Sequence, residues 1–383
     1  MITTINNKHN KLNVPNLRFK EFLGEWEELG LSELLDFKNG LNPKSDKFGK
    51  GIKFISVMDI LNNAVITYDC IKASVDVTEK ELSDFSVEKG DILFQRSSET
   101  LEDVGRANVY MDDKTAIFGG FVIRGKKKGE YDPQYFNYLL RSPFARKRII
   151  PMGAGAQHFN IGQEGLSKVK LHFANIEEQK KIGNFLSLLD ERIATQNKII
   201  DKLQSLIKGI AQKIVRNNKP NVRLTECLEC KSSTLQESEV CEQGTYPVYG
   251  ANGIVGYLDN YNTESEAVYI IKDGSGVGTV SYVKGQCSAT GTLNTLQAKD
   301  GYSLQYLYYL LKVFNFEPYK TGMAIPHIYF KDYGKAKVFC PSYTEQLQYA
   351  RLLSAIESKL SIEKNILISL SLQKQYLLRQ MFI

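Results

Sequence analysis

The sequence predicts an α+β fold in which two tandem globular domains of mixed α/β structure are separated by two long coiled-coil helices, with pseudo-twofold symmetry. One observation behind this prediction is a repeat, because QYFNYLLR at 134–141 returns as QYLYYLLK at 305–312. Another is a pair of long amphipathic segments that open on the same Glu-Gln dipeptide, at 178–179 and again at 345–346. Self-similarity of this kind is typical of a duplicated chain, so each copy is expected to hold one globular part followed by one helix.

The composition is that of a folded globular protein. The 383 residues are 43% hydrophobic and 24% charged, and this length predicts two or three domains. A net charge of +6 permits a polyanionic partner without requiring one. No apolar run is long enough to cross a bilayer, and six cysteines in a chain of this length make a poor disulfide framework. A cytoplasmic, reducing location is therefore predicted.

The first copy is expected to begin with a loose polar tail over residues 1–14, followed by a globular domain over residues 15–174. Its segments VEKGDILFQRSS and AIFGGFVIRG have the β-branched and aromatic content of strands, with glycines marking turns. The tyrosine-rich repeat predicts a short helix with Tyr135, Tyr138 and Leu139 at its apolar positions. Long glycine-rich loops separate these elements, and such loops on a scaffold usually carry recognition.

A long helix is predicted over residues 175–216, then a second globular domain over 217–342 and a closing helix over 343–383. The second domain contains the strand-like segments AVYIIKD and GTVSYV. In both helices apolar residues alternate in steps of three and four, as in a coiled-coil seam. The seam positions include Leu186, Leu189, Ile193, Ile200 and Leu203 in the first helix and Leu353, Ile356, Leu360, Leu367 and Leu370 in the second. Each seam is interrupted by a polar residue at the matching position, Gln196 and Glu363.

A long helix with one apolar stripe must bury that stripe against another helix or another chain, so the two helices are expected to pair. About 38 residues at roughly 1.5 Å per residue form a rod of roughly 57 Å. An antiparallel pair would place the globular parts at opposite ends of this rod, further apart than one turn of duplex DNA, which is roughly 34 to 36 Å. The same pattern fits an ordinary helical hairpin in a structural protein, and this alternative stays open.

The order and doubling of these features resemble the specificity (S) subunits of type I restriction-modification systems. The resemblance is carried by VPNLRFKEFLGEWEELGLSELL near the start, EEQKKIGNFLSLLDERI in the first helix, YPVYGANGIVGYL and IIKDGSGVGTVSY in the second domain, and the closing helix that opens on TEQ. One departure is visible. HFANIEEQ lacks the proline that usually precedes the Glu-Gln helix of the family, whereas the second copy retains Pro341.

The resemblance implies a protein that recognises DNA and has no catalytic site or cofactor of its own. In that family two target-recognition domains, here 15–174 and 217–342, each read one half of a bipartite double-stranded DNA target. The helices pack antiparallel, set the spacing and bind two methyltransferase (M) subunits, which methylate adenine at N6 with S-adenosylmethionine. Restriction (R) subunits add cleavage of unmodified DNA with ATP and magnesium. DNA, M subunits and R subunits are therefore the implied partners.

Candidate DNA contacts lie in the loops of the two domains. Arginine, asparagine, glutamine and lysine can make paired hydrogen bonds to bases, and glycine-rich turns let the backbone approach phosphate. His158 and His327 occupy matching places upstream of the two long helices. The predicted DNA-binding residues are Arg96, Ser97, Arg106 and His158 in the first domain, and Asn252, Lys272, Ser275, Asn294 and His327 in the second. The basic run RSPFARKRII either neutralises phosphates or is a solvated face.

Three other motifs fit structural roles better than cofactor or metal binding. GFVIRGK at 120–126 lacks the Ser or Thr of a phosphate-binding loop and is expected to be a strand. GSGVG at 274–278 lacks the third glycine and the following helix of a dinucleotide loop, so it is expected to form a tight turn. Cys227, Cys230 and Cys241 have no fourth zinc ligand nearby, so no metal site is predicted.

No methyltransferase, nuclease or complete nucleotide-binding motif is recognised in the chain, so a non-catalytic DNA-recognition subunit is predicted. Two alternatives from other classes remain. A methyltransferase or nuclease fused to its reader would modify or cut DNA without any partner. A coiled-coil scaffold with no role in nucleic-acid binding would bind DNA weakly and without regard to sequence.

Overall fold

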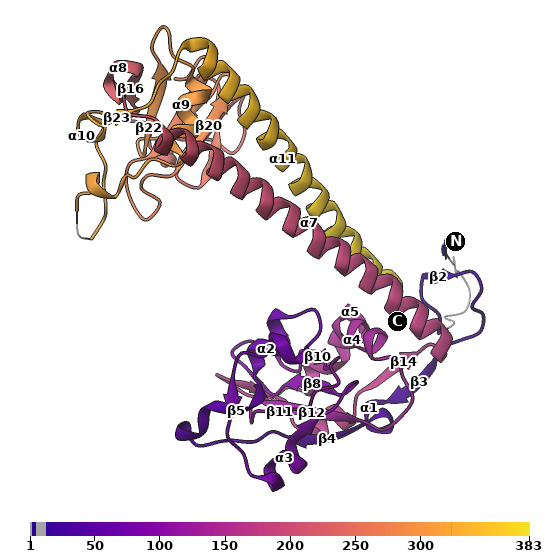
Figure 1. Ribbon diagram of the computed structural model, residues 1–383. Coiled ribbons are helices and arrows are strands. Elements are labelled where there is room, and N and C mark those ends of the chain that lie inside the picture. The colour runs from indigo at the N-terminus through magenta and orange to yellow at the C-terminus, as the bar shows by residue number, and fades with distance from the viewer. Residues whose placement is uncertain (1, 5–12, 323) are drawn as a thin grey trace. The chain divides into compact units, whose positions relative to one another are not determined.

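The structure, a computed structural model, describes residues 2–4, 13–322 and 324–383 (Figure 1). Of the segment expected to be a loose tail, residues 5–12 lie outside the described residues. Residues 2–4 form strand β1 (Ile2–Thr4), which pairs antiparallel with β2 (Leu17–Phe19). Within the described ranges, no helix has both the length and the hydropathy that crossing a membrane requires.

The chain divides into two compact units, residues 1–196 with 366–383 and residues 197–365. The long helices α7 (Ile176–Asn217) and α11 (Tyr343–Gln380) each contribute to both units. Each unit therefore contains one globular domain, part of α7 and part of α11.

Two four-stranded sheets form the globular domain of the first unit. The first has the order β10-β8-β12-β4 and is antiparallel throughout, with strands β10 (Ala107–Val109), β8 (Ile92–Gln95), β12 (Val122–Lys127) and β4 (Leu35–Asn39). The second has the order β6-β5-β11-β7, with strands β6 (Ser74–Val75), β5 (Phe48–Ile55), β11 (Ala116–Phe118) and β7 (Ser86–Val87). In the second sheet β11 runs parallel to β5, while the other two pairs are antiparallel.

Short strands and helices complete this domain. Two antiparallel strand pairs join segments distant in sequence, β3 (Glu27–Gly30) with β14 (Lys170–Phe173) and β9 (Ser97–Ser98) with β13 (Phe159–Asn160). The short helices are α1 (Leu31–Leu34), α2 (Val57–Asn62), α3 (Glu79–Phe85), α4 (Pro133–Arg141), α5 (Pro143–Ile149) and α6 (Gln163–Ser167). The predicted strands in VEKGDILFQRSS and AIFGGFVIRG are confirmed as β8, β11 and β12.

The second unit repeats the topology of the first. Its larger sheet has the antiparallel order β20-β19-β22-β16, with strands β20 (Val280–Lys284), β19 (Glu266–Ile271), β22 (Leu293–Ala298) and β16 (Leu228–Ser232). A smaller sheet has the order β18-β17-β21, with strands β18 (Gly253–Leu258), β17 (Tyr246–Gly250) and β21 (Ser288–Ala289). Its parallel pair β17–β21 corresponds to β5–β11 in the first unit. The duplication inferred from short sequence repeats therefore extends to the strand order.

The remaining elements of the second unit also have counterparts in the first. Strand β15 (Val222–Arg223) pairs with β23 (Lys337–Val338), as β3 pairs with β14. The short helices are α8 (Leu224–Cys227), α9 (Leu304–Leu311) and α10 (Phe330–Tyr333).

The tyrosine-rich repeat forms α4 and α9, as predicted. Asp132 caps α4 by accepting a hydrogen bond of 2.8 Å from the backbone N–H of Tyr135, and Pro133 at the first helical position fits its fixed φ. Ser303 caps α9 in the same way. The predicted apolar positions Tyr135, Tyr138 and Leu139 are buried, so α4 is part of the core of the first unit.

The long helices run antiparallel to each other in both units. In the first unit the early part of α7 lies beside the late part of α11, since Leu377 and Met381 share a core with Ile182 and Leu186. In the second unit the late part of α7 and the early part of α11 line one cavity, to which Ile207 and Leu360 contribute. The antiparallel packing that the family resemblance implies is therefore observed.

Burial along the helices follows the three-four spacing. The buried seam residues are Leu186, Ile200, Leu353, Leu360 and Leu370, and the half-buried ones are Leu189, Ile193, Leu203, Ile356 and Leu367. The two polar interruptions are also removed from water, with Gln196 buried and Glu363 half-buried. A second set of apolar side chains on the two helices is exposed, and it includes Leu188, Leu206, Leu352, Ile362, Ile368, Leu372 and Tyr376.

Helix α7 starts without the proline that precedes α11. Instead, the side-chain oxygen of Asn175 accepts a hydrogen bond of 2.9 Å from the backbone N–H of Glu178, which is an N-cap. At the start of α11, Ser342 and Glu345 bond to each other reciprocally in a capping box. Asn175 and Ser342 stand at matching positions, so both long helices begin with a side-chain N-cap, and Ala174 stands where the second copy has Pro341.

Candidate nucleic-acid interface and helix joints

Three residues predicted to contact DNA in the first domain lie on or beside paired strands. Strand β9 pairs with β13 so that Ser97 lies opposite Asn160, and the Ser97 hydroxyl hydrogen-bonds the Asn160 side-chain carbonyl. The backbone N–H of Ile161 donates to the carbonyl of Arg96 at 2.9 Å. His158 directly precedes β13 and is exposed. The fold thus brings Arg96, Ser97 and His158 into one neighbourhood.

The loop that carries His158 depends on glycine. Gly155 has a φ of +149°, and a Cβ at this position would lie 2.0 Å from the carbonyl oxygen of His158. The backbones of Ala154 and Asn160 exchange two hydrogen bonds of 2.9 Å, which close the loop at its base. The loop is therefore a tight hairpin with His158 near its exposed end.

Arg106 directly precedes strand β10, which pairs with β8. Its carbonyl accepts a hydrogen bond of 2.7 Å from Gln95, and its guanidinium pairs with Asp103 at 2.6 Å. It lines a hollow of about 410 Å³ together with Arg141 and Arg146. Arg146 donates to three backbone carbonyls of residues 102–105, and burial lowers the pKa of its guanidinium to about 10. The basic run after α4 thus uses at least one of its arginines to hold a loop.

Three predicted residues of the second domain line one hollow of about 510 Å³. They are Lys272, which follows β19, Asn294 in β22, and His327 in the loop before α10. The His327 Nδ1 lies 2.6 Å from the Asp273 carboxylate, and the Tyr329 ring stacks on the imidazole at a centroid distance of 6.5 Å. A ring held between a carboxylate and an aromatic side chain is fixed in orientation.

Asn294 lies at the buried side of this hollow, with 3% of its surface exposed. Its amide nitrogen donates to the Tyr333 hydroxyl at 3.1 Å, and its amide oxygen accepts from Ser232 at 3.4 Å. Burial raises the pKa of the nearby Cys230 thiol to about 11, although the ammonium of Lys272 opposes this shift. Asn294 is therefore already engaged within the protein, whereas Lys272 and His327 are half-buried.

The last two predicted residues are exposed on turns. Ser275 follows Gly274, whose φ is +92° and whose N–H donates to the carbonyl of Pro326 at 3.0 Å. The segment 274–278 is thus the expected turn, and it is tied to the loop that carries His327. Asn252 lies in the hairpin turn between β17 and β18 and does not line the hollow of Lys272.

The repeated Glu-Gln dipeptide forms a joint between each domain and its helix. The Gln179 side-chain oxygen accepts from the N–H of Asp132 at 2.9 Å, while its nitrogen donates to the carbonyl of Ala174 at 2.8 Å. Gln346 repeats both bonds with Ser303 and Pro341, at 2.9 Å each. Since Asp132 and Ser303 are the N-caps of α4 and α9, each glutamine fixes the start of a short helix to the start of a long one.

A second joint lies about three turns further along each helix. In the first unit, the Tyr138 hydroxyl donates to Asp190 at 2.8 Å, and the ammonium of Lys374 pairs with the same carboxylate at 2.5 Å. In the second unit, the Tyr309 hydroxyl donates to Glu357 at 2.7 Å. Asp190 and Glu357 are separated by 167 positions, the same interval as the two Glu-Gln dipeptides.

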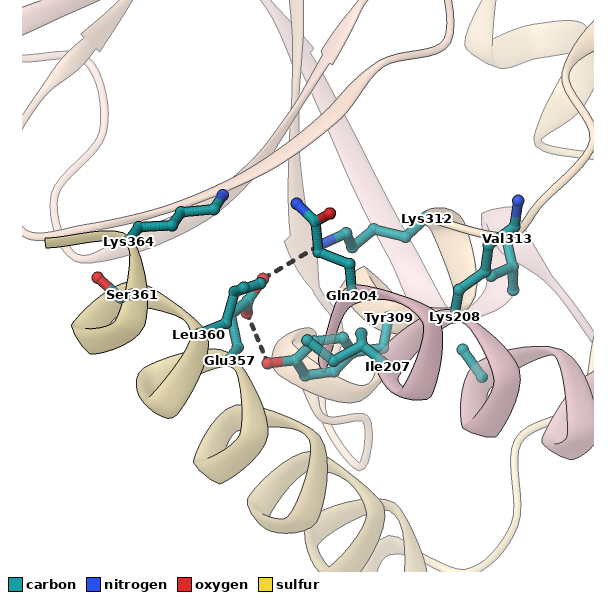
Figure 2. A pocket seen from close by; sticks show the side chains of 11 residues that line it. Gln204, Ile207, Lys208, Tyr309, Lys312, Val313, Glu357, Leu360, Ser361 and Lys364 are labelled. Atoms are coloured by element: carbon teal, nitrogen blue, oxygen red, sulfur yellow. Dashed lines mark hydrogen bonds and ion pairs between the residues drawn. The ribbon is translucent and has the colours of Figure 1, made fainter. Parts of the chain in front are cut away.

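The cation of this joint comes from different elements in the two units. In the first unit it is Lys374 of α11, whereas in the second it is Lys312 at the end of α9, whose ammonium lies 3.0 Å from Glu357 (Figure 2). Burial alone would raise the pKa of Glu357, but hydrogen bonds from Tyr309, Lys312 and Tyr308 outweigh it and hold this pKa below its ordinary value. The Glu357 carboxylate is therefore ionised and saturated by its own domain.

The glutamate of the dipeptide also differs between the copies. Glu178 is fully buried and accepts two hydrogen bonds from Arg18, at 2.8 and 2.7 Å, and one from the Trp26 indole at 3.2 Å. Glu345, its counterpart, is exposed and bonds only locally to Ser342 among the interactions described for it. The start of α7 is thus anchored by the N-terminal segment in a way that α11 does not repeat.

Comparison with known proteins gives a family whose model, described as the type I restriction modification DNA specificity domain, matches residues 24–205 and again residues 218–372. The chain belongs to this family. The two matched stretches are the duplicated halves, and each specificity domain includes its globular part and most of the following helix.

Relatives with the same description share the sequence at moderate identity. A protein of Methanocaldococcus jannaschii that is named as the specificity subunit of the type I restriction enzyme MjaX is 27% identical over 207 residues, which span 53% of this chain and 48% of the relative. A type I specificity subunit of Mycoplasma genitalium is 26% identical over 277 residues, 66% of this chain and 71% of the relative. The match thus spans about half the length of the first relative.

Solved structures give the same fold over nearly the whole chain. The crystal structure of a type I restriction-modification S subunit from M. genitalium has a TM-score of 0.65 at 20% identity and covers 97% of this chain and 99% of the other. A structure from work on assembly and conformational transition of the type I R-M system has a TM-score of 0.55 at 15% identity. Two specificity domains in tandem are therefore the fold of this chain.

Several residues of the specificity domains were not predicted from the sequence. The tyrosine of the repeat was assigned to the core, but its hydroxyl also binds the carboxylate of a long helix. The sequence analysis uses the glutamine of each dipeptide only as evidence of duplication and predicts no contact for its side chain. The sequence does contain a signal for these carboxylates, because Asp190 and Glu357 recur at the interval of the Glu-Gln dipeptides. The tyrosines that they bind lie 52 and 48 positions earlier in the chain, so the sequence alone does not pair them.

Among the described residues, no group of three or more His, Cys, Asp or Glu side chains is placed to hold a metal ion.

Proposed function

We propose that this chain is the DNA specificity subunit of a type I restriction-modification complex, in which each specificity domain reads one half of a bipartite target. The observation that carries the proposal is the doubling of the whole domain. The larger sheets of the two units have corresponding strand orders, and both units fix the tyrosine-rich helix to a long helix through the same glutamine joint. Two similar readers in one chain suit a target with two separate halves.

The residues proposed to face DNA are the clustered loop residues of each domain. In the first domain these are Arg96, Ser97 and His158, with Arg106 on the next strand. In the second domain they are Lys272 and His327, together with Ser275 and Asn252, whereas the buried Asn294 supports the hollow from below through its bond to Tyr333. Basic and amide side chains supply phosphate contacts and paired hydrogen bonds to bases.

The helix pair is proposed to set the distance between the half-sites and to dock two M subunits. The exposed apolar residues on α7 and α11, including Leu188, Leu206, Leu352, Ile362 and Leu372, are the surface for this docking. Adenine-N6 methylation with S-adenosylmethionine would belong to the M subunits, and cleavage with ATP and magnesium to R subunits. This chain would act in the cytoplasm as a subunit without catalysis of its own.

Sequencing of methylated adenines tests this proposal in a host that expresses the chain with its cognate M subunit. The expected result is one bipartite motif, with two short specific halves separated by an unspecific gap. Exchange of residues 15–174 for the matching domain of a relative is expected to change one half of the motif and leave the other intact.

Three outcomes would contradict the proposal. If both halves or neither half change, the two domains do not read separately. If the purified chain methylates or cuts DNA without partners, it is a fused enzyme. If it binds DNA weakly and with equal affinity for all sequences, it is a scaffold.

A further inference from the structure

The second unit contains a cavity of about 410 Å³ at the place where α7, α9 and α11 meet (Figure 2). Its apolar walls are formed by Ile207 and Ala211 of α7, Leu360 of α11 and Val313 after α9. Its polar lining includes three lysines, Lys208, Lys312 and Lys364, together with Glu357. A cavity on the paired helices with both an apolar wall and several cations has the features of a specific docking site.

Two residues that line the cavity have longer side chains at the matching positions of the first copy. At the interval of 167 residues that relates the two helices, Ala211 corresponds to Leu378 and Ile207 to Lys374. In the first unit Leu378 packs against the hydrophobic core, and Lys374 pairs with Asp190. The equivalent space in the first unit is therefore occupied by the protein's own side chains.

The charge around the cavity also differs between the two copies. Lys208 corresponds to Gln375 and Lys364 corresponds to Asn197, so two lysines of the second copy stand where the first copy has amides. Glu357 does not neutralise them, because its carboxylate is already bound by Tyr309, Tyr308 and Lys312 at 2.7, 3.0 and 3.0 Å. For Lys208 and Lys364, the described residues supply no ion pair.

We propose that this cavity receives an apolar side chain, flanked by carboxylates, from the M subunit that docks on the helices of the second unit. The apolar residue would pack on Ala211 and Leu360, and the carboxylates would pair with Lys208 and Lys364. This inference rests on the proposed function, and it adds that the two M docking faces of the chain are not equivalent. In the first unit, Leu378 and Lys374 stand at the positions of the residues that line this cavity.

An acidic protein segment suits the cavity better than a DNA backbone does. A phosphate chain carries the charge to pair with lysines, but it has no apolar group to fill a wall made of isoleucine, alanine, valine and leucine. A desolvated apolar anchor within a rim of charge pairs is the usual arrangement of an energetically dominant contact between proteins.

The test compares variants that convert the cavity into its first-copy counterpart. Ala211→Leu fills the cavity, and the double variant Lys208→Gln, Lys364→Asn removes its charge. Lys359→Asn is the matched control, because Lys359 is exposed on α11, the helix that carries Lys364, and does not line the cavity. Each full-length variant is titrated with the cognate M subunit, and the number of bound copies and both dissociation constants are measured by native mass spectrometry.

Ala211→Leu is expected to weaken one of the two M binding steps by about tenfold or more and to leave the other unchanged. The double lysine variant, which changes only the rim, is expected to weaken the same step and to reduce its salt dependence. Lys359→Asn is expected to bind both copies as the wild type does. Binding of a target duplex by the free chain should be the same for all variants.

Two results would overturn the inference while leaving the proposed function intact. The first is wild-type binding of two M subunits by both cavity variants. The second is loss of duplex binding by the double lysine variant alone, which would assign the lysines to DNA. If the wild-type chain itself binds no M subunit, the proposed function fails and the inference fails with it.

Discussion

The buried ion pair between Arg18 and Glu178 gives a sharp prediction, because the duplicated chain supplies its own control. Glu178 and Glu345 open the two long helices at matching positions, yet Glu178 is fully buried while Glu345 is exposed. The same substitution at both positions therefore separates the effect of burial from that of helix position.

Glu178→Ala removes the acceptor of two hydrogen bonds from Arg18 and of one from Trp26. Loss of one partner from a buried ion pair typically costs about 3 to 5 kcal/mol, because the other charge stays buried. Arg18 still donates to the carbonyl of Gly24 at 2.6 Å, so a cost of about 3 kcal/mol is expected, near the lower limit. Glu345→Ala removes one half of an exposed capping box and should cost about 1 kcal/mol or less.

The assay can isolate the first unit, because the chain contains a single tryptophan, Trp26, which is buried there and contacts Glu178. Urea unfolding followed by tryptophan fluorescence therefore reports the first unit, and far-ultraviolet circular dichroism reports the whole chain. With a denaturant slope of about 2 kcal/mol per molar, a loss of about 3 kcal/mol lowers the fluorescence midpoint by about 1.5 M.

Glu345→Ala should leave the fluorescence midpoint unchanged and shift the circular dichroism curve only slightly. Equal destabilisation by the two substitutions would refute the reasoning, since it would mean that burial of the Arg18 pair contributes nothing beyond helix capping. A conservative Glu178→Gln variant should lie between the wild type and Glu178→Ala, because an amide still accepts hydrogen bonds but carries no charge.

Three further predictions concern spacing, recognition and pH. Insertion of one heptad after both Gln196 and Glu363 lengthens each helix by about 10.5 Å, so the gap in the methylated motif should grow by about three base pairs; an unchanged gap would contradict the spacer role. Lys272→Ala and His327→Ala should weaken binding of a target duplex and alter or relax one half of the motif, whereas the exposed Lys299→Ala should change neither. The folded-state pKa of Glu357 is depressed, so its contribution to stability is present above the unfolded pKa of about 4.5 and is lost as pH falls through the folded value. The difference in free energy of unfolding between wild type and Glu357→Gln, measured by urea unfolding, should therefore shrink from pH 6 to pH 3. A difference that stays constant would mean that protonation of Glu357 is not coupled to unfolding.

The duplication was accessible from the sequence because its repeated segments can be matched directly, and the helix seams were accessible because their signals are local. A three-four alternation of apolar residues specifies a buried stripe whatever its partner is, and residues from Leu186 to Leu370 along the two helices follow that alternation. The short tyrosine-rich helices were equally accessible, since capping and apolar spacing act within about one turn.

The candidate DNA site was only partly accessible. Residue chemistry and glycine-rich loops selected Arg96, Lys272 and His327, but their grouping depends on strand pairing between distant segments, such as β9 with β13. The amide of Asn294 has the right chemistry for reading bases, yet the fold buries it against Tyr333. Residue type indicates what a side chain can bind, while burial determines what it can reach.

The sequence by itself determined that this protein contains an internal duplication, with two domains of mixed α/β structure and two long helices whose apolar faces need partners. The tertiary structure decided how the copies differ. Glu178 and Glu345 are identical letters at matching positions, but one is buried under Arg18 and Trp26 and the other faces water. Ala211 lines a cavity in the second unit, whereas Leu378, its counterpart in the first unit, packs against the hydrophobic core. The physical reason is that periodicity and capping act over a few neighbouring residues, whereas burial, charge pairing and cavities depend on segments that only the folded chain brings together.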